Sequence, residues 1–496
     1  MLVDVRPTAR LRGDKAIDVT AALRPVIDAL CAETIDLSRV RVVCDWIQYR
    51  HNFRDAVDVR PILPWRRGDG GGNGARGRPV GAADVEVAVD LRRAAGPEID
   101  RIAAQAIAAG DGDRGVVLEP FAPISQSCIW DFNRLYWQAL DRWETATGRK
   151  YESALPGGTS DARNVSGVRE LIADLFASWD RLVDREALPD ELYVIELGVG
   201  NGHQAQTFLD TFMLMDAEQG KQYHRRLHYL MCDYSAHVLE MARVTVAAHG
   251  DRVSSFVLDA TRPTTALAFL KFKVFLVYVS NVYDNLPTDE VARLGGHDYL
   301  VESRAYLPEI AAEGLGAEFG VARADLVDTV ARLLRLGPVL LAETMPAAFP
   351  DVDTAVRFWQ MAWEAVRLQE RYAPMAGLDL YAVAPGVSGE LLRPLLEMGG
   401  DVRLHVNNGA IASFVDTLPL LHPYGRLCCH DIIVTDAHRY RTGFLGPGKY
   451  DGSVVNWVNG PLLTHVGRRK GFDVDFAPFA HREGTNIVTM TARVRD

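Results

Sequence analysis

The residues best suited to chemistry lie in one short segment, Val194-Ile-Glu196-Leu-Gly198-Val-Gly200-Asn-Gly202. An apolar run ends in a carboxylate, and glycine then takes every second position before a stretch of helical character. Glycine lets the backbone turn tightly and lets a ligand approach where a β-carbon would collide. The segment therefore predicts a binding loop between a strand and a helix, with Glu196 and the three glycines at its wall.

The position of the acid and the spacing of the glycines favour a cationic ligand over a dinucleotide. Dinucleotide-binding loops place the third glycine three residues after the second and seat a pyrophosphate at the helix N-terminus. Here the interval is two residues, and Glu196 would repel a pyrophosphate. S-adenosylmethionine carries a sulfonium, an ammonium and no phosphate, so we predict it as the cofactor. A purely structural glycine turn is the alternative, and a dehydrogenase is disfavoured.

Two later acids extend the predicted cofactor site. Asp233 follows the apolar run Tyr229–Cys232 and is suited to the ribose hydroxyls, while Asp259 follows Ser255–Leu258 and is suited to the adenine amino group. Ligands of open α/β sheets bind at the carboxyl ends of the strands, where these acids are expected. Helix capping is the alternative for Asp233. The predicted contacts are completed by Tyr234, Ala260 and Ser280.

The elements around these acids predict an α/β fold with a mainly parallel, Rossmann-like sheet, because strands alternate with helices. The expected strands are Leu192–Leu197, Tyr229–Cys232, Ser255–Leu258 and Val274–Val279, and the expected helices are His203–Met215 and Ala236–Ala248. Apolar residues then recur at helical spacing, which predicts a helical insertion over residues 304–384 that covers the substrate. The sheet is expected to resume with strands Val402–Val406 and Arg426–Cys429.

This pattern divides the chain into four segments. Residues 1–115 form an N-terminal accessory segment, with strands expected at Val40–Cys44 and Val85–Leu91 and a mobile glycine-rich loop at 66–78. Residues 116–303 and 385–496 form the two parts of the catalytic domain, on either side of the insertion. The insertion's aromatic side chains, Phe358, Trp359 and Trp363, fit a core better than a substrate cage.

Further motifs resemble one family of enzymes. They are Asn164–Ala173, the glycine segment, Ser280-Asn-Val-Tyr283-Asp284-Asn-Leu-Pro287, Gly425–Asp431 and Asp451–Val474, together with the long spacer between Glu196 and Asp233. In this order they resemble the MidA-like class I S-adenosylmethionine-dependent methyltransferases, whose mitochondrial members dimethylate an arginine of a respiratory complex I subunit. The resemblance implies a Rossmann-like methyltransferase fold and S-adenosylmethionine as cofactor.

The departures from that family concern the substrate. The family's Asn-Glu pair is Ser280-Asn281 here, and its Asp-Tyr-Gly is Asp431-Ile-Ile. A neutral amide at Asn281 cannot supply the charge that a guanidinium needs, so we predict a substrate less cationic than arginine. Asp284 is the best candidate base, with capping of a turn as its alternative. The other candidate catalytic residues are Asn281, Tyr283 and Asp431.

Composition limits the partners. Of 496 residues, 48% are apolar and 24% charged, which is typical of a folded protein with more than one structural unit. The net charge of −11 argues against nucleic acid. Six cysteines without a Cys-x-x-Cys pair predict free thiols and no metal site. No apolar run is long enough to span a membrane, and no signal pattern opens the chain, so we predict a cytoplasmic protein.

These observations predict a methyltransferase that acts on a nitrogen or oxygen nucleophile of a small molecule or a protein side chain. Two alternatives stay open. Another carbon of the sulfonium could be attacked, which gives a non-methylating enzyme, or the chain could be a methyltransferase-like, non-catalytic assembly subunit. The oligomeric state, homomeric or heteromeric, also stays open.

Overall fold

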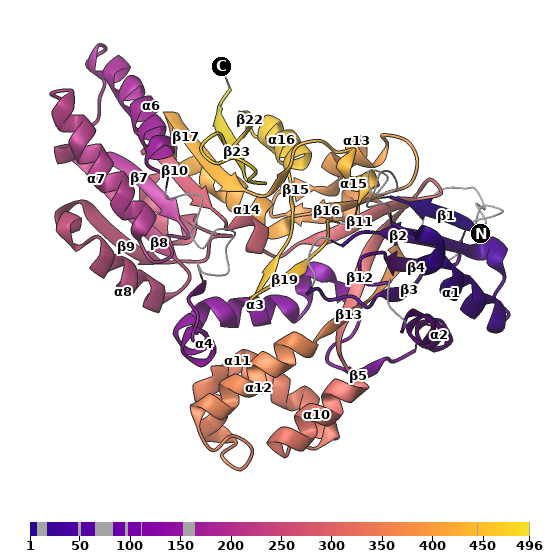
Figure 1. The fold of residues 1–496 in the computed structure, drawn as a ribbon. Helices are drawn as coiled ribbons and strands as arrows, with labels where there is room; N and C mark the ends of the chain where they lie inside the picture. The colour runs from indigo at the N-terminus through magenta and orange to yellow at the C-terminus, as the bar shows by residue number, and fades with distance from the viewer. Residues whose placement is uncertain are drawn as a thin grey trace.

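A doubly wound sheet forms the centre of the molecule. The computed structural model describes residues 1–6, 17–47, 51–64, 83–94, 98–110, 112–151, 164–443 and 445–495. The central sheet has the order β22-β23-β17-β10-β7-β8-β9 (Figure 1). Its strands are β7 (Leu192–Leu197), β8 (Leu227–Asp233), β9 (Val253–Val257), β10 (Val274–Ser280), β17 (Leu421–Asp431), β22 (Phe472–Pro478) and β23 (Val488–Val494). Strands β9 to β17 are parallel, and β23 and β22 are antiparallel. The predicted Rossmann-like α/β fold is confirmed.

Helices cover both faces of this sheet because its strands are apolar on both sides. Successive residues of a strand point to opposite faces, so Val194 packs under one helical layer and Ile195 under the other. The layers are α6 (Val165–Val183), α7 (His203–Glu218) and α8 (Ala236–Thr245) on one face, and α14 (Asn408–Thr417) and α16 (Gly460–Arg469) on the other. The order of the strands reverses between β7 and β10, which is where such sheets bind ligands.

A second, antiparallel sheet separates β10 from β17 in the chain. It has the order β13-β12-β11-β16 and comprises β11 (Asp289–Leu294), β12 (His297–Pro308), β13 (Arg367–Pro374) and β16 (Val402–Val406). The short strands β5 (Gly115–Val117) and β6 (Ala122–Pro123) also pair with β12. The expectation that Val402–Val406 resumes the central sheet is therefore wrong. A short apolar run gives no information on the sheet to which it belongs.

Helices occupy only the middle of the predicted helical insertion at 304–384. They are α10 (Glu309–Phe319), α11 (Leu326–Thr344) and α12 (Val352–Ala365), and they pack with α3 (Ile129–Gln138) and α4 (Leu140–Thr147) at the bottom of Figure 1. Both ends of the predicted segment are strands, β12 and β13. Phe358, Trp359 and Trp363 are fully buried in this layer, as predicted.

The N-terminal segment folds as a four-stranded sheet with two helices. The order is β1-β2-β4-β3, with β1 (Leu2–Val5), β2 (Val40–Asp45), β3 (Val57–Pro61), β4 (Val85–Asp90), α1 (Val19–Ala32) and α2 (Ile99–Ala109). The two predicted strands are present as β2 and β4, and the glycine-rich loop predicted at 66–78 lies outside the described residues. Ile62, just after β3, pairs with Tyr372 of β13, which joins this sheet to the second one.

A buried network of ion pairs lies at that junction. Glu370 of β13 accepts hydrogen bonds from Arg403 of β16 at 3.0 Å and from Arg54, and it lies 3.0 Å from Arg60 of β3. Arg60 also donates to Glu86 of β4 at 2.9 Å. Each of these side chains is at most 6% exposed. Charges from two sheets and from the loop that holds Arg54 are thus neutralised inside the protein.

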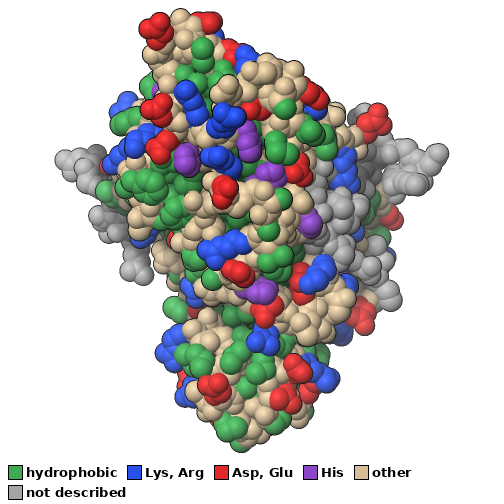
Figure 2. All heavy atoms as spheres, turned by 90° about the vertical axis from the view of Figure 1, so that its left-hand side faces the viewer, with side chains coloured by type: hydrophobic (Ala, Val, Ile, Leu, Met, Phe, Trp, Pro, Cys, Tyr) green, Lys and Arg blue, Asp and Glu red, His purple; other side chains and the backbone are tan. Residues whose placement is uncertain are grey.

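The surface carries charges of both signs. On the face shown in Figure 2, basic and acidic side chains are intermixed, with several histidines and only small apolar areas between them. None of the helices in the described part of the chain is long and apolar enough to cross a bilayer. The six cysteines are unpaired, and Cys31 is exposed. Within the described residues, no group of His, Cys, Asp or Glu has the arrangement of a metal site.

Candidate active site

The glycine loop has the backbone that its sequence predicted. Gly198, Gly200 and Gly202 all have positive φ, at 75°, 56° and 81°, a conformation that side chains disfavour. A β-carbon on Gly198 would lie 2.3 Å from Val282, and one on Gly200 would lie 2.8 Å from the hydroxyl of Tyr151. Both glycines line a large cavity.

Gly202 has a different role from the one predicted. It is not among the described residues that line the cavity, and a β-carbon there would lie 2.7 Å from the Cα of Ala242 in α8. Gly202 therefore allows the start of α7 to pack against α8. The prediction that it contacts the cofactor is corrected, because its free side faces a helix.

Glu196 ends β7 as a buried carboxylate without a basic partner among the described residues. The hydroxyl of Tyr229 donates a hydrogen bond to it at 2.7 Å. Burial raises the pKa of Glu196 to about 8, helped by the nearby charge of Asp233 and opposed by the Tyr229 hydrogen bond. A cationic ligand beside this group would stabilise its charged form.

Asp233 ends β8 and holds the glycine loop in place. Its carboxylate accepts hydrogen bonds from the backbone N–H of Gly200 at 3.2 Å and of Ser235 at 3.0 Å. Burial raises its pKa to about 6, although these N–H groups favour the charged form. The capping role considered for Asp233 belongs to Ser235, whose hydroxyl accepts from Val238 at 3.3 Å.

The remaining predicted cofactor residues lie where they were expected. Asp259 follows β9 with an exposed carboxylate, which accepts hydrogen bonds from the N–H and the hydroxyl of Thr261 at 2.8 Å each. Asp259 lines the cavity together with Tyr234, Ala260 and Ser280. The carboxyl ends of four neighbouring parallel strands thus open into one space.

This cavity has a volume of about 880 Å³ and an acidic wall. Among the described residues, the acids that line it are Asp131, Glu196, Asp233, Asp259, Asp284, Asp451 and Glu483, and the basic residues are Arg134 and Arg482. Arg134 pairs with Asp131 at 2.9 Å, which cancels part of the positive charge. The excess of carboxylates favours a cationic occupant and disfavours a phosphate-bearing one.

Asp284 and Asp431 form a buried acid pair beyond the end of β10. Asp431 accepts hydrogen bonds from the backbone N–H of Tyr283 at 2.9 Å, Asp284 at 3.3 Å and Ile432 at 2.8 Å. Burial raises the pKa of Asp431 to about 6 against these N–H groups, and burial together with the Asp431 charge raises the pKa of Asp284 well above its usual value. Because the two buried acids lie together, they titrate as a pair, and burial disfavours the charged form of both.

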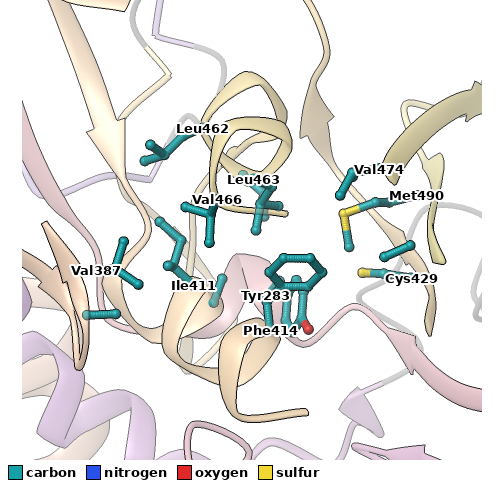
Figure 3. Packing of buried hydrophobic residues seen from close by; sticks show 14 of the residues in the cluster. Tyr283, Val387, Ile411, Phe414, Cys429, Leu462, Leu463, Val466, Val474 and Met490 are labelled. Carbon is teal, nitrogen blue, oxygen red and sulfur yellow. The ribbon is translucent and has the colours of Figure 1, made fainter. Parts of the chain in front are cut away.

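Only part of the predicted catalytic set lines the cavity. Asp284 and Asn281 do, and Asn281 has a φ of 51°, uncommon for a residue other than glycine. Asp431 lies behind Asp284 and is fully buried. Tyr283 points the other way, into the core beside Phe414 and Cys429 (Figure 3). Tyr283 is therefore a core residue, which corrects its assignment as catalytic.

The wall that faces the strand ends differs from the prediction. No described residue between 288 and 431 lines the cavity, so the 304–384 segment is not its lid. Its helices instead pack on α3, and α3 lines the cavity together with residues 482–487 and the hairpin of β19 (Gly448–Tyr450) and β20 (Ser453–Val455). The lid is thus built from segments on both sides of the predicted one.

Two asparagines that were not predicted from the sequence hold this wall together. Asn133 of α3 donates to the carbonyl of Asn285 at 2.9 Å and accepts from the N–H of Val454 at 2.9 Å. Asn456 donates twice to the carbonyl of Asp284, at 2.9 Å from its backbone and 2.7 Å from its side chain. The Asp451–Val474 segment, singled out by resemblance, was the only indication of the hairpin.

Comparisons with solved structures yield distant similarities. A protein from Burkholderia thailandensis, crystallised with bound S-adenosyl-homocysteine, is 14% identical over 75% of this chain and 88% of its own, with a TM-score of 0.42. The DszA carbon methyltransferase is 12% identical over 73% of this chain and 66% of its own, with a TM-score of 0.32. No family model matches the sequence, and no curated protein matches it.

Proposed function

We propose that the protein is an S-adenosylmethionine-dependent methyltransferase that acts on a nitrogen or oxygen nucleophile of a small molecule or protein side chain. One observation carries the proposal. Glu196, Asp233 and Asp259 lie at or just after the carboxyl ends of three neighbouring parallel strands and line the same cavity as the glycine loop. Carboxylates at these positions suit a ligand with an ammonium, a sulfonium and ribose hydroxyls.

The residues present fit this cofactor better than a dinucleotide. The N–H of Gly200 donates to Asp233, so the glycine loop already satisfies an acid. Glu196 keeps a buried carboxyl that only Tyr229 contacts through a hydrogen bond among the described residues. A pyrophosphate would meet these carboxylates, whereas a cation would be stabilised by them. The B. thailandensis structure with bound S-adenosyl-homocysteine agrees with this choice but does not carry it.

Methyl transfer requires little covalent chemistry from the protein itself. Glu196, Asp233 and Asp259 would hold S-adenosylmethionine, which would supply a methyl group that its sulfonium already activates for displacement by a nucleophile. The chain has to orient the nucleophile and exclude water, which α3 and the β19–β20 hairpin do by covering the strand ends. Burial raises the pKa of Asp284 well above its usual value, which disfavours the charged form that a general base needs.

The finer assignments remain proposals. Within this function we propose kinship with the MidA-like methyltransferases, supported by the element Ser280–Pro287, whose Asp284 lines the cavity. We also propose that arginine is not its efficient substrate, that no nucleic acid or membrane is bound, and that the protein acts in the cytoplasm. The oligomeric state, homomeric or heteromeric, stays open.

Calorimetry with S-adenosylmethionine, S-adenosylhomocysteine and NAD tests the proposal. We expect the first two ligands to bind and NAD not to bind. Gly200→Val should abolish binding, because the new side chain would enter the cavity wall beside Tyr151. Gly220→Val is the matched control, since Gly220 also has positive φ, at 63°, but has open space around it. Equal binding by both variants and the wild type would refute the cofactor site.

A further inference from the structure

The cavity extends beyond the strand ends to a region that is lined by other parts of the chain. Its wall comes from α3, from the β19–β20 hairpin and from the segment after β10 that holds Asp284. None of these parts belongs to the predicted cofactor site, and the function proposed above gives α3 and the hairpin no role in recognising the substrate. Among these parts, the hairpin has the most unusual backbone conformation and packing.

Asp451 sits at the turn of this hairpin in a tightly determined conformation. Its φ is 51°, in the left-handed region that non-glycine residues rarely adopt. Its carbonyl accepts a hydrogen bond from the indole N–H of Trp363 at 2.7 Å. The next residue, Gly452, packs so closely that a β-carbon would lie 2.1 Å from the ring of Tyr136. Strained residues held this firmly are concentrated at ligand-binding sites.

The carboxylate of Asp451 is fixed through one oxygen only. Its Oδ2 accepts from the hydroxyl of Tyr136 at 2.9 Å and from the indole N–H of Trp143 at 3.2 Å. Within the described part of the chain, its Oδ1 accepts no hydrogen bond, and Asp451 lines the cavity. The carboxylate of a residue that lines the cavity is therefore fixed through Oδ2, while Oδ1 has no hydrogen bond from a described residue.

The surroundings define the chemistry of an occupant of this region. Asp284 and Glu483 line the same cavity, and the ring of Trp137, packed edge-on against Tyr136 and Tyr151, adds an aromatic surface. Carboxylates and aromatic faces both favour a protonated nitrogen. A guanidinium is held best by two parallel hydrogen bonds to one carboxylate, and Asp451 has only one oxygen left for a ligand.

We propose that Asp451 is the residue that recognises the substrate, and that its Oδ1 accepts one hydrogen bond from a primary or secondary amine. The assignment rests on the proposed methyltransferase function and deepens it. The competing role is structural, because Tyr136 and Trp143 need an acceptor for their buried donors. An asparagine would fill that structural role, since its amide oxygen can accept both bonds and it tolerates positive φ.

A pair of cofactor analogues tests the assignment without knowledge of the natural substrate. In both, nitrogen replaces the sulfur of S-adenosylhomocysteine, and it carries a 3-aminopropyl arm in one and a butyl arm in the other. The wild-type protein should bind the amino analogue at least about tenfold more tightly, the scale of a charge-assisted hydrogen bond. Asp451→Asn should bind both within about threefold and should keep its affinity for S-adenosylhomocysteine.

Each other outcome has a defined meaning. A wild type without preference, or an Asp451→Asn variant with the full preference, would overturn the recognition role while leaving the cofactor site intact. Tyr136→Phe is the control, because it removes a donor to Asp451 but keeps the carboxylate, and it should retain the preference. If S-adenosylhomocysteine fails to bind the wild type, the proposed function fails and this assignment fails with it.

Discussion

Two groups of buried carboxylates in this protein have opposite electrostatic surroundings. At the junction of the N-terminal and second sheets, burial disfavours the charge of Glu86, but Arg60, Arg41 and Arg6 outweigh it and lower its pKa to about 2. In the cavity, burial raises the pKa of Glu196 to about 8, and none of the described residues opposes it with a positive charge. A buried carboxylate that pairs with a basic residue of the protein is structural. A buried carboxylate without such a partner among the described residues is suited to binding a cationic ligand.

The largest expected effect is on the paired group. Glu370→Gln leaves the guanidiniums of Arg54, Arg60 and Arg403 short of a buried counter-charge. Removing one partner of a buried ion pair typically costs about 3–5 kcal/mol, so the free energy of unfolding in urea should fall by that amount. Affinity for S-adenosylmethionine in the still-folded fraction should be unchanged.

Glu309→Gln is the matched control for that substitution. Glu309 pairs with Arg323 at 2.7 Å, but both side chains are exposed by about half, and such surface pairs contribute at most about 1 kcal/mol. A loss of stability equal to that of Glu370→Gln would contradict the distinction between buried and exposed pairs.

An intermediate effect is expected at the cavity. Asp233→Ala removes the acceptor for the N–H groups of Gly200 and Ser235 and the proposed partner of the ribose hydroxyls. Cofactor affinity should fall by about 1.5–3 kcal/mol, the scale of a hydrogen bond to a charged group. The folded state should persist, because Ser235 still caps α8. A variant that unfolds but binds normally once stabilised would instead make Asp233 a structural residue.

The smallest effect is a difference in pH dependence between the two groups. The folded-state pKa of Glu196 is raised from 4.5 to about 8, so its burial lowers stability progressively as pH rises through that window. The pKa of Glu86 is lowered from 4.5 to about 2, so its contribution is present above pH 4.5 and is lost as pH falls toward 2. Thermal unfolding of Glu196→Gln should therefore show a flatter decline between pH 5 and 8 than the wild type. An unchanged decline would contradict the raised pKa.

The part of the cavity at the strand ends was predictable because its residues are local in sequence. Glu196, Gly198 and Gly200 lie within five residues, and Asp233 and Asp259 follow recognisable strands, so their positions follow from the α/β pattern. The alternation of strands and helices also predicted the parallel strands at the centre of the sheet. The prediction that Gly202 contacts the cofactor failed, because the contact of Gly202 with Ala242 depends on how two helices pack.

The rest of the molecule depends on contacts that periodicity does not encode. The alternating run Val85–Asp90 reads as a strand with one solvent face, yet nearly all of it is buried, because Arg60 and Tyr372 cover Glu86. Tyr283 stands next to Asp284 in sequence but on the opposite side of the backbone, in the core. Neither burial of charge by a second sheet nor the direction of a side chain in an irregular turn can be obtained from spacing.

The placement of the second sheet also governs how the protein folds. Strands β10 and β17 are paired at the middle of the central sheet, yet residues 281–420 separate them in the chain. Closing so long a connection is slow unless the intervening residues first fold on themselves. We therefore expect the second sheet and its helices to fold before β17 pairs with β10. Glu370 does not line the cavity, yet Glu370→Gln should slow refolding of the central sheet.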